Sequence, residues 1–94
     1  MTTLQIEHPI LDFESWKKAF ESDPIGRKKA GVRAYRIFRP IEDSKYVMID
    51  LDFDDRSGAE MFLGKLRKLW TQVEGTILMN PQTRIAEMVE TRTY

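Results

Sequence analysis

The sequence lacks cysteine entirely and has a single histidine among its 94 residues. Without cysteine the chain cannot form a disulfide, a thiolate nucleophile, an iron–sulfur cluster or a cysteine-ligated zinc site. Because His8 is the sole imidazole, one chain also cannot build a multi-histidine metal site. We therefore expect no metal and no other cofactor.

An excess of charge is lacking too, because 15 basic residues balance 15 acidic ones. Proteins that bind nucleic acid or anionic membranes need surplus cations to displace counterions, so the neutral total argues against both partners. No apolar run approaches the roughly 18 residues of a membrane span, and Met1–Leu4 shows no signal-peptide pattern. We expect a cytoplasmic protein in which residues 1–94 form one domain.

The spacing of apolar residues predicts four strands and two helices. Leu4 and Ile6 alternate with polar neighbours, as in a half-buried strand, whereas Phe13, Trp16 and Phe20 recur at helical steps. Gly75 is expected to end the second helix, whose apolar stripe is the strongest in the chain. The elements or stripes expected, in chain order, are Thr3–His8, Phe13–Ser22, Val32–Arg39, Tyr46–Phe53, Ala59–Val73 and Thr83–Glu90.

Both predicted helices carry start signals. Asp12 offers an N-cap oxygen to the first helix, and we interpret it as a cap rather than a catalytic acid. Ser57 and Glu60 have the spacing of a capping box at the second helix. Trp16 and Trp70 fall on the apolar stripes of the two helices, so we assign them to core packing.

The order strand, helix, strand, strand, helix, strand predicts a ferredoxin-like α+β fold. Right-handed crossovers place both helices on one face of a four-stranded antiparallel sheet. The other face of the sheet is then left uncovered, and we call it the open face.

The hairpin register decides which residues the open face carries. If Pro40 lies opposite Tyr46, Arg36 pairs with Asp50 and Phe38 with Met48. A one-residue slip would bury Arg36 under the helices without a carboxylate, which costs several kcal/mol. We therefore favour the first register.

On that register the open face combines Phe38 and Met48 with an Arg36–Asp50 pair. A second copy placed face to face would bury the apolar residues and enclose the charges in a shared cavity. We expect a homodimer through the open face. The alternative is a monomer on which Phe38 and Met48 are ordinary exposed hydrophobic residues.

The segments Asp12–Lys17, Gly31–Arg39 and Val47–Phe53, in this order of elements, resemble the dimeric α+β barrel superfamily, which includes antibiotic-biosynthesis mono-oxygenase-like proteins. The resemblance implies a homodimer whose sheets build a barrel around a ligand cavity. It implies no single reaction, because members range from cofactor-independent oxygenases of aromatic polyketides to haem-degrading enzymes. The haem-degrading branch relies on a cavity Asn, a Trp and a haem-ligating His. The only Asn, Asn80, lies in a Pro-flanked loop, which argues against haem chemistry.

Two properties select the candidate site residues: titration near neutral pH, and a charge pair on the open face. His8 is the default general base, because imidazole titrates near neutral pH, although a partly exposed histidine at a strand end is the plainer interpretation. Arg36 would anchor a polar group of a ligand, with Asp50 orienting it or taking a proton; a purely structural Arg36–Asp50 pair is the alternative. Phe38 and Met48 would line the same cavity.

Three functions remain open from the sequence. The first is a homodimeric binding protein that holds a small, mostly apolar ligand with one polar handle. The second is a cofactor-independent mono-oxygenase or isomerase of an aromatic, polyketide-like substrate, in which the protein supplies a base, a cavity and desolvation. The third is a structural dimer with a filled interior.

Overall fold

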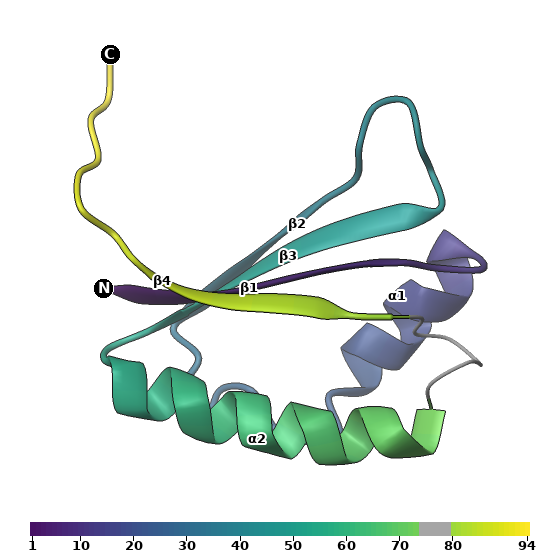
Figure 1. Cartoon of the computed structure of the whole chain (residues 1–94), viewed down its shortest axis with the longest axis horizontal. Helices are drawn as coiled ribbons and strands as arrows, with labels where there is room; N and C mark the ends of the chain where they lie inside the picture. Colours follow the sequence, from purple (N-terminus) through teal and green to yellow (C-terminus); the bar gives the residue numbers. More distant parts are fainter. Residues whose placement is uncertain (74–79) are drawn as a thin grey trace.

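A computed structural model describes residues 1–73 and 80–94 of the chain. These residues form β1 (Thr2–Pro9), α1 (Phe13–Ser22), β2 (Ala34–Phe38), β3 (Tyr46–Phe53), α2 (Arg56–Val73) and β4 (Gln82–Glu87). The strands make one antiparallel sheet in the order β2-β3-β1-β4. Both helices lie on the same side of this sheet, below it in Figure 1. The predicted ferredoxin-like α+β fold is confirmed.

The predicted hairpin register is also confirmed. Arg36 lies opposite Asp50, and Phe38 lies opposite Met48. Since side chains alternate between the faces of a sheet, these four residues share the face away from the helices.

The core fills the space between the sheet and the helices. Its strand residues alternate with those of the open face, and α2 contributes the inner side of its apolar stripe. The core contains the buried hydrophobic residues Leu4, Ile6, Ile10, Trp16, Val32, Val47, Ile49, Leu51, Phe53, Ala59, Phe62 and Leu63.

Two strands differ in extent from their predicted ranges. β2 begins two residues later than predicted, because the Val32 amide donates to the carbonyl of Arg27 in the preceding turn, and it ends at Phe38, one residue before Arg39. β4 ends at Glu87 rather than Glu90, and the remaining residues run on as a tail. In Figure 1 this tail leaves the sheet on the side away from the helices. The predicted helix end at Gly75 lies outside the described residues.

The first helix begins as predicted, and the second does not. The Asp12 carboxylate accepts the Ser15 amide at 2.8 Å, which is an N-cap bond. The predicted capping box of Ser57 and Glu60 is wrong, because α2 begins at Arg56, two residues earlier than a Ser57 cap would give, and Asp55 accepts the Gly58 amide at 2.8 Å instead. A carboxylate before the first turn satisfies the same free amide, and Glu60 pairs with Arg56.

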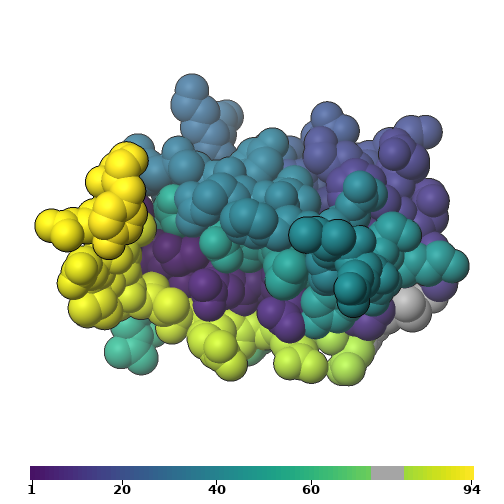
Figure 2. Space-filling model, turned by 90° about the horizontal axis from the view of Figure 1, so that it is seen from above, coloured from purple at the N-terminus to yellow at the C-terminus, as the bar shows by residue number. Residues whose placement is uncertain are grey.

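The open face is seen directly in Figure 2, where side chains of β1, β2 and β3 cover the middle of the surface and the tail closes one end. Phe38 is 48% exposed within a single chain. Met48 beside it is half-buried. Polar residues share the face, since the register places Gln5, Glu7 and Arg84 on the same side. The open face is therefore mixed in polarity rather than mainly apolar.

Candidate functional site

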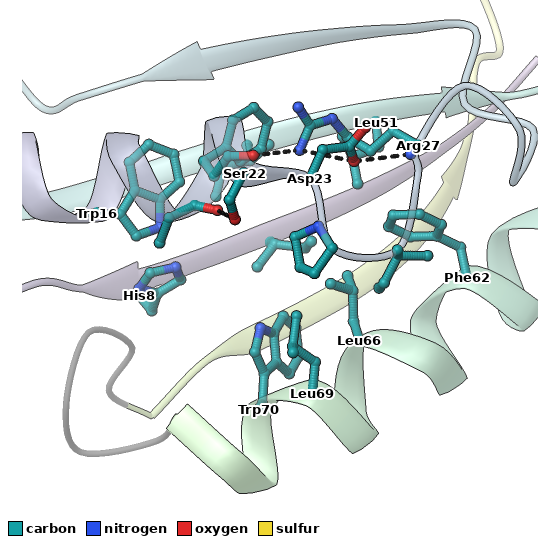
Figure 3. A pocket seen from close by; sticks show the side chains of 16 residues that line it. His8, Trp16, Ser22, Asp23, Arg27, Leu51, Phe62, Leu66, Leu69 and Trp70 are labelled. Carbon is teal, nitrogen blue, oxygen red and sulfur yellow. Dashed lines mark hydrogen bonds and ion pairs between the residues drawn. The ribbon is translucent and has the colours of Figure 1, made fainter.

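A cavity of about 330 Å³ lies between the helices and the covered face of the sheet. Its size falls at the lower end of the range for small-molecule sites. The mainly apolar lining is interrupted by four polar or charged residues: His8, Ser22, Asp23 and Arg27 (Figure 3). The cavity is lined by Ile6, His8, Trp16, Ala19, Phe20, Ser22, Asp23, Pro24, Ile25, Arg27, Ile49, Leu51, Phe62, Leu66, Leu69 and Trp70.

His8 is part of this cavity wall and is only 1% exposed, which overturns the interpretation of a partly exposed strand-end histidine. The reason is strand periodicity, because His8 follows Leu4 and Ile6 on the covered face. Nδ1 of its ring lies 2.9 Å from the carbonyl oxygen of Pro9. A carbonyl can only accept, so Nδ1 carries the proton and Nε2 of the neutral ring has the lone pair.

Burial keeps that ring neutral. Desolvation lowers the pKa of His8 below its ordinary value of 6.5, and the bond to Pro9 offsets only part of this effect. Near neutral pH the His8 side chain is therefore an uncharged base rather than a cation.

Aromatic side chains from α1 form one wall of the cavity. The Trp16 and Phe20 rings are stacked with centroids 5.2 Å apart, and Trp16 lies 6.3 Å from the His8 ring. Trp70 adds a second indole from α2 (Figure 3). Flat apolar walls of this kind favour a planar ligand.

The segment after α1 closes another side of the cavity. Arg27 lies over the Phe20 ring, 3.9 Å from its centroid, and donates to the Phe20 carbonyl oxygen at 2.8 Å. Asp23 pairs with the same guanidinium at 3.5 Å and accepts the Arg27 amide at 2.9 Å. The charge of Arg27 is thus already balanced by protein groups.

Four of the sequence-predicted site residues lie elsewhere, on the open face. Phe38, Met48, Arg36 and Asp50 are brought together by the register, as expected. The sheet separates them from the cavity of their own chain, which none of them lines. Their predicted role in ligand binding, and that of Asp50 in proton transfer, would need a second cavity formed with another copy.

The chief partner of Arg36 is Asp52 rather than Asp50. Both terminal nitrogens of the guanidinium donate to the Asp52 carboxylate at 2.9 Å, and Asp50 lies 3.5 Å away. Thr3 donates to Asp52 as well, at 2.9 Å. Hydrogen bonds from Arg36 and then Thr3 lower the pKa of Asp52, against the opposing effect of burial. An arginine held by two carboxylates is poorly placed to anchor an anionic ligand.

Sequence reasoning missed Asp52 as a partner, although a signal was present. Asp52 lies two residues after Asp50 on the same strand, so it shares the open face and is a diagonal neighbour of Arg36. The cavity residues Trp16, Phe20 and Trp70 were assigned to packing because an apolar stripe does not distinguish a filled core from a cavity wall.

Within residues 1–73 and 80–94, no cluster of three or more His, Asp or Glu side chains could hold a metal ion. No helix in this part of the chain combines the length and apolar character needed to cross a membrane.

Comparison with solved structures places the fold among small ferredoxin-like proteins. The chain is similar to a protein of unknown function from Nitrosomonas europaea, with a TM-score of 0.75, 13% identity and coverage of 99% and 93% of the two chains. It is similar to a dimeric ferredoxin-like protein from an uncultured marine organism, with a TM-score of 0.67, 13% identity and 97% coverage of each chain. A variant of SnoaB, a cofactor-independent oxygenase from Streptomyces nogalater, gives a TM-score of 0.71 at 11% identity over 96% and 94% of the chains.

No protein-family model matches the sequence, and no curated protein matches it. At the identities above, the structural likeness establishes the fold and leaves the reaction open. The chain has the fold of the dimeric ferredoxin-like and antibiotic-biosynthesis mono-oxygenase-like proteins, as its sequence pattern indicated.

Proposed function

We propose that this protein binds a small, mostly apolar molecule with one polar handle, in the cavity between its helices and its sheet. The observation that carries the proposal is the cavity itself, about 330 Å³ of space walled by aromatic and aliphatic side chains. Its lining is mainly apolar, so a ligand that covers these side chains gains the free energy of removing apolar surface from water.

The proposed site differs in place from the shared cavity that the open face suggested. Each chain would hold its own ligand, and the open face would serve to join two copies. The dimeric ferredoxin-like protein of similar fold supports this homodimer. The contacts of Arg36 with Asp52 and Asp50 support it further, because a face whose charges are already paired can be covered at lower cost.

A cofactor-independent mono-oxygenase or isomerase is the second candidate, favoured by the uncharged imidazole in the cavity wall. Nε2 of His8 would take a proton from an activated carbon of the substrate. In an isomerisation the proton returns to a different carbon. In an oxygenation the carbanion gives its electrons to dioxygen, and one oxygen atom ends in a ketone and the other in water.

Filling the cavity tests the proposed function. Ala19 lines the cavity from α1, so Ala19→Phe would occupy the space that a ligand needs. We expect this variant to fold and to lose binding of a hydrophobic probe such as 2-naphthol, measured by calorimetry. Glu21→Phe, on the same helix but outside the cavity lining, should bind as the unaltered protein does. If Ala19→Phe binds 2-naphthol as tightly as the unaltered protein, the proposed site is wrong.

A further inference from the structure

Two ring nitrogens with opposite hydrogen-bonding character lie at one end of the cavity. Nε2 of His8 accepts, because Nδ1 is occupied by Pro9. Nε1–H of Trp16 donates, and in Figure 3 this nitrogen lies on the edge of the indole that faces His8. Neither nitrogen has a hydrogen-bond partner among the described residues.

Both nitrogens belong to residues that line the cavity. In the described part of the chain, every fully buried side-chain nitrogen or oxygen atom has a hydrogen-bond partner. Trp16 and His8 are both buried residues that line the cavity, 5% and 1% exposed. A nitrogen of these residues that lacks a partner therefore keeps some accessible surface, and the cavity is the space that both residues line.

The chemistry of the pair selects among ligand groups. A ketone or a carboxylate can accept from Trp16 but offers His8 nothing, and an ammonium donates to His8 but cannot accept from Trp16. A hydroxyl does both through one oxygen atom. The aromatic walls of Trp16, Phe20 and Phe62 favour a hydroxyl carried on a flat ring.

We propose that the polar handle of the ligand is a neutral aromatic hydroxyl, as in a phenol or naphthol, held between Nε1–H of Trp16 and Nε2 of His8. This inference rests on the proposed ligand-binding function and adds the chemical class of the ligand. It also assigns His8 as the acceptor of the hydroxyl proton, the position from which it would act as a base.

Three matched compounds test the inference: 2-naphthol, 2-methoxynaphthalene and naphthalene. All three fit the same apolar space, but the methoxy compound accepts without donating and naphthalene does neither. We expect calorimetry to show 2-naphthol binding about tenfold more tightly than the other two, the effect of one or two net hydrogen bonds. In Trp16→Phe, which keeps an aromatic ring and loses the N–H, the preference for 2-naphthol over naphthalene should fall to about threefold or less.

The outcomes separate the two proposals. If all three compounds bind equally well to the unaltered protein, the hydroxyl site is wrong while ligand binding stands. If none binds, the proposed function fails as well. The comparison of compounds on the unaltered protein does not depend on Trp16→Phe folding.

Discussion

At the scale of single residues, the position of a polar group decides what it can do. His8 and Arg36 were both predicted to be site residues, and they lie on opposite faces of the sheet. His8 could have been placed from the alternation that begins at Leu4 and Ile6, because period 2 leaves no choice of face. The sequence pattern did not predict the hydrogen bond from Nδ1 of His8 to the carbonyl oxygen of Pro9, which sets the tautomer of the ring.

The depressed pKa of His8 predicts a pH-dependent stability. The unfolded chain takes up a proton near pH 6.5, whereas the folded chain resists it until lower pH, so the free energy of unfolding falls as pH drops below 6.5. Above pH 6.5 the ring is neutral in both states, so its full contribution to the free energy of unfolding is present there. Urea unfolding between pH 7 and 5 should show this loss, and His8→Phe should remove it. An equal loss in His8→Phe would contradict the assignment.

The Arg36–Asp52 bond predicts that replacing Arg36 lowers the free energy of unfolding more than replacing Arg33 does. Arg36→Gln leaves the buried Asp52 carboxylate with Thr3 as its remaining donor in the described structure, and should lower the free energy of unfolding by about 1–3 kcal/mol. Arg33→Gln is the control, because its pair with Asp54 is more than half exposed and should matter by about 0–1 kcal/mol. Urea unfolding at one protein concentration measures both. Equal losses would show that burial of Asp52 has no energetic consequence.

At the scale of elements, prediction succeeded where the determining contacts are local. α1 and β3 have the expected bounds, because a capping carboxylate directly precedes α1 and a period-2 apolar pattern runs through β3. β2 was too long because pairing with β3, not its own composition, sets its ends. The cavity could not be predicted, because it depends on the distance that packing leaves between α1 and the sheet.

The N-cap of α1 gives a prediction at this scale. Asp12→Ala removes the acceptor of the Ser15 amide and should lower the free energy of unfolding by about 0.5–2 kcal/mol. Asp12→Asn keeps a side-chain oxygen and should retain most of that stability. Thermal unfolding of the pair checks this, and an Asn variant as unstable as the Ala variant would exclude capping as the cause.

At the scale of the whole molecule, the proposals give the two faces of the sheet separate tasks. The covered face and the helices enclose the cavity, and the open face carries paired charges beside Phe38 and Met48. Under the proposals, each chain would hold a ligand on one side of the sheet and join a second copy on the other. The same division makes assembly and ligand binding separable by mutation.

The proposed homodimer predicts different masses for two matched variants. Met48→Glu adds a charge to the open face and should convert the dimer to a monomer, because the new carboxylate would be buried without a partner. Met61→Glu makes the same change on α2, where the side chain is 65% exposed, and should remain a dimer. Light scattering with size-exclusion chromatography gives both masses. A dimeric Met48→Glu variant would rule out the open face as the interface.

The location of bound ligand tests the account most directly. Methyl NMR of protein labelled at isoleucine, leucine and methionine, titrated with 2-naphthol, reports on both faces of the sheet at once. Ligand in the cavity should shift the methyl signals of Ile6, Ile49 and Leu66 and leave Met48 unchanged. Shifts confined to Met48, or no shifts at saturating 2-naphthol, would contradict a ligand site between the helices and the sheet.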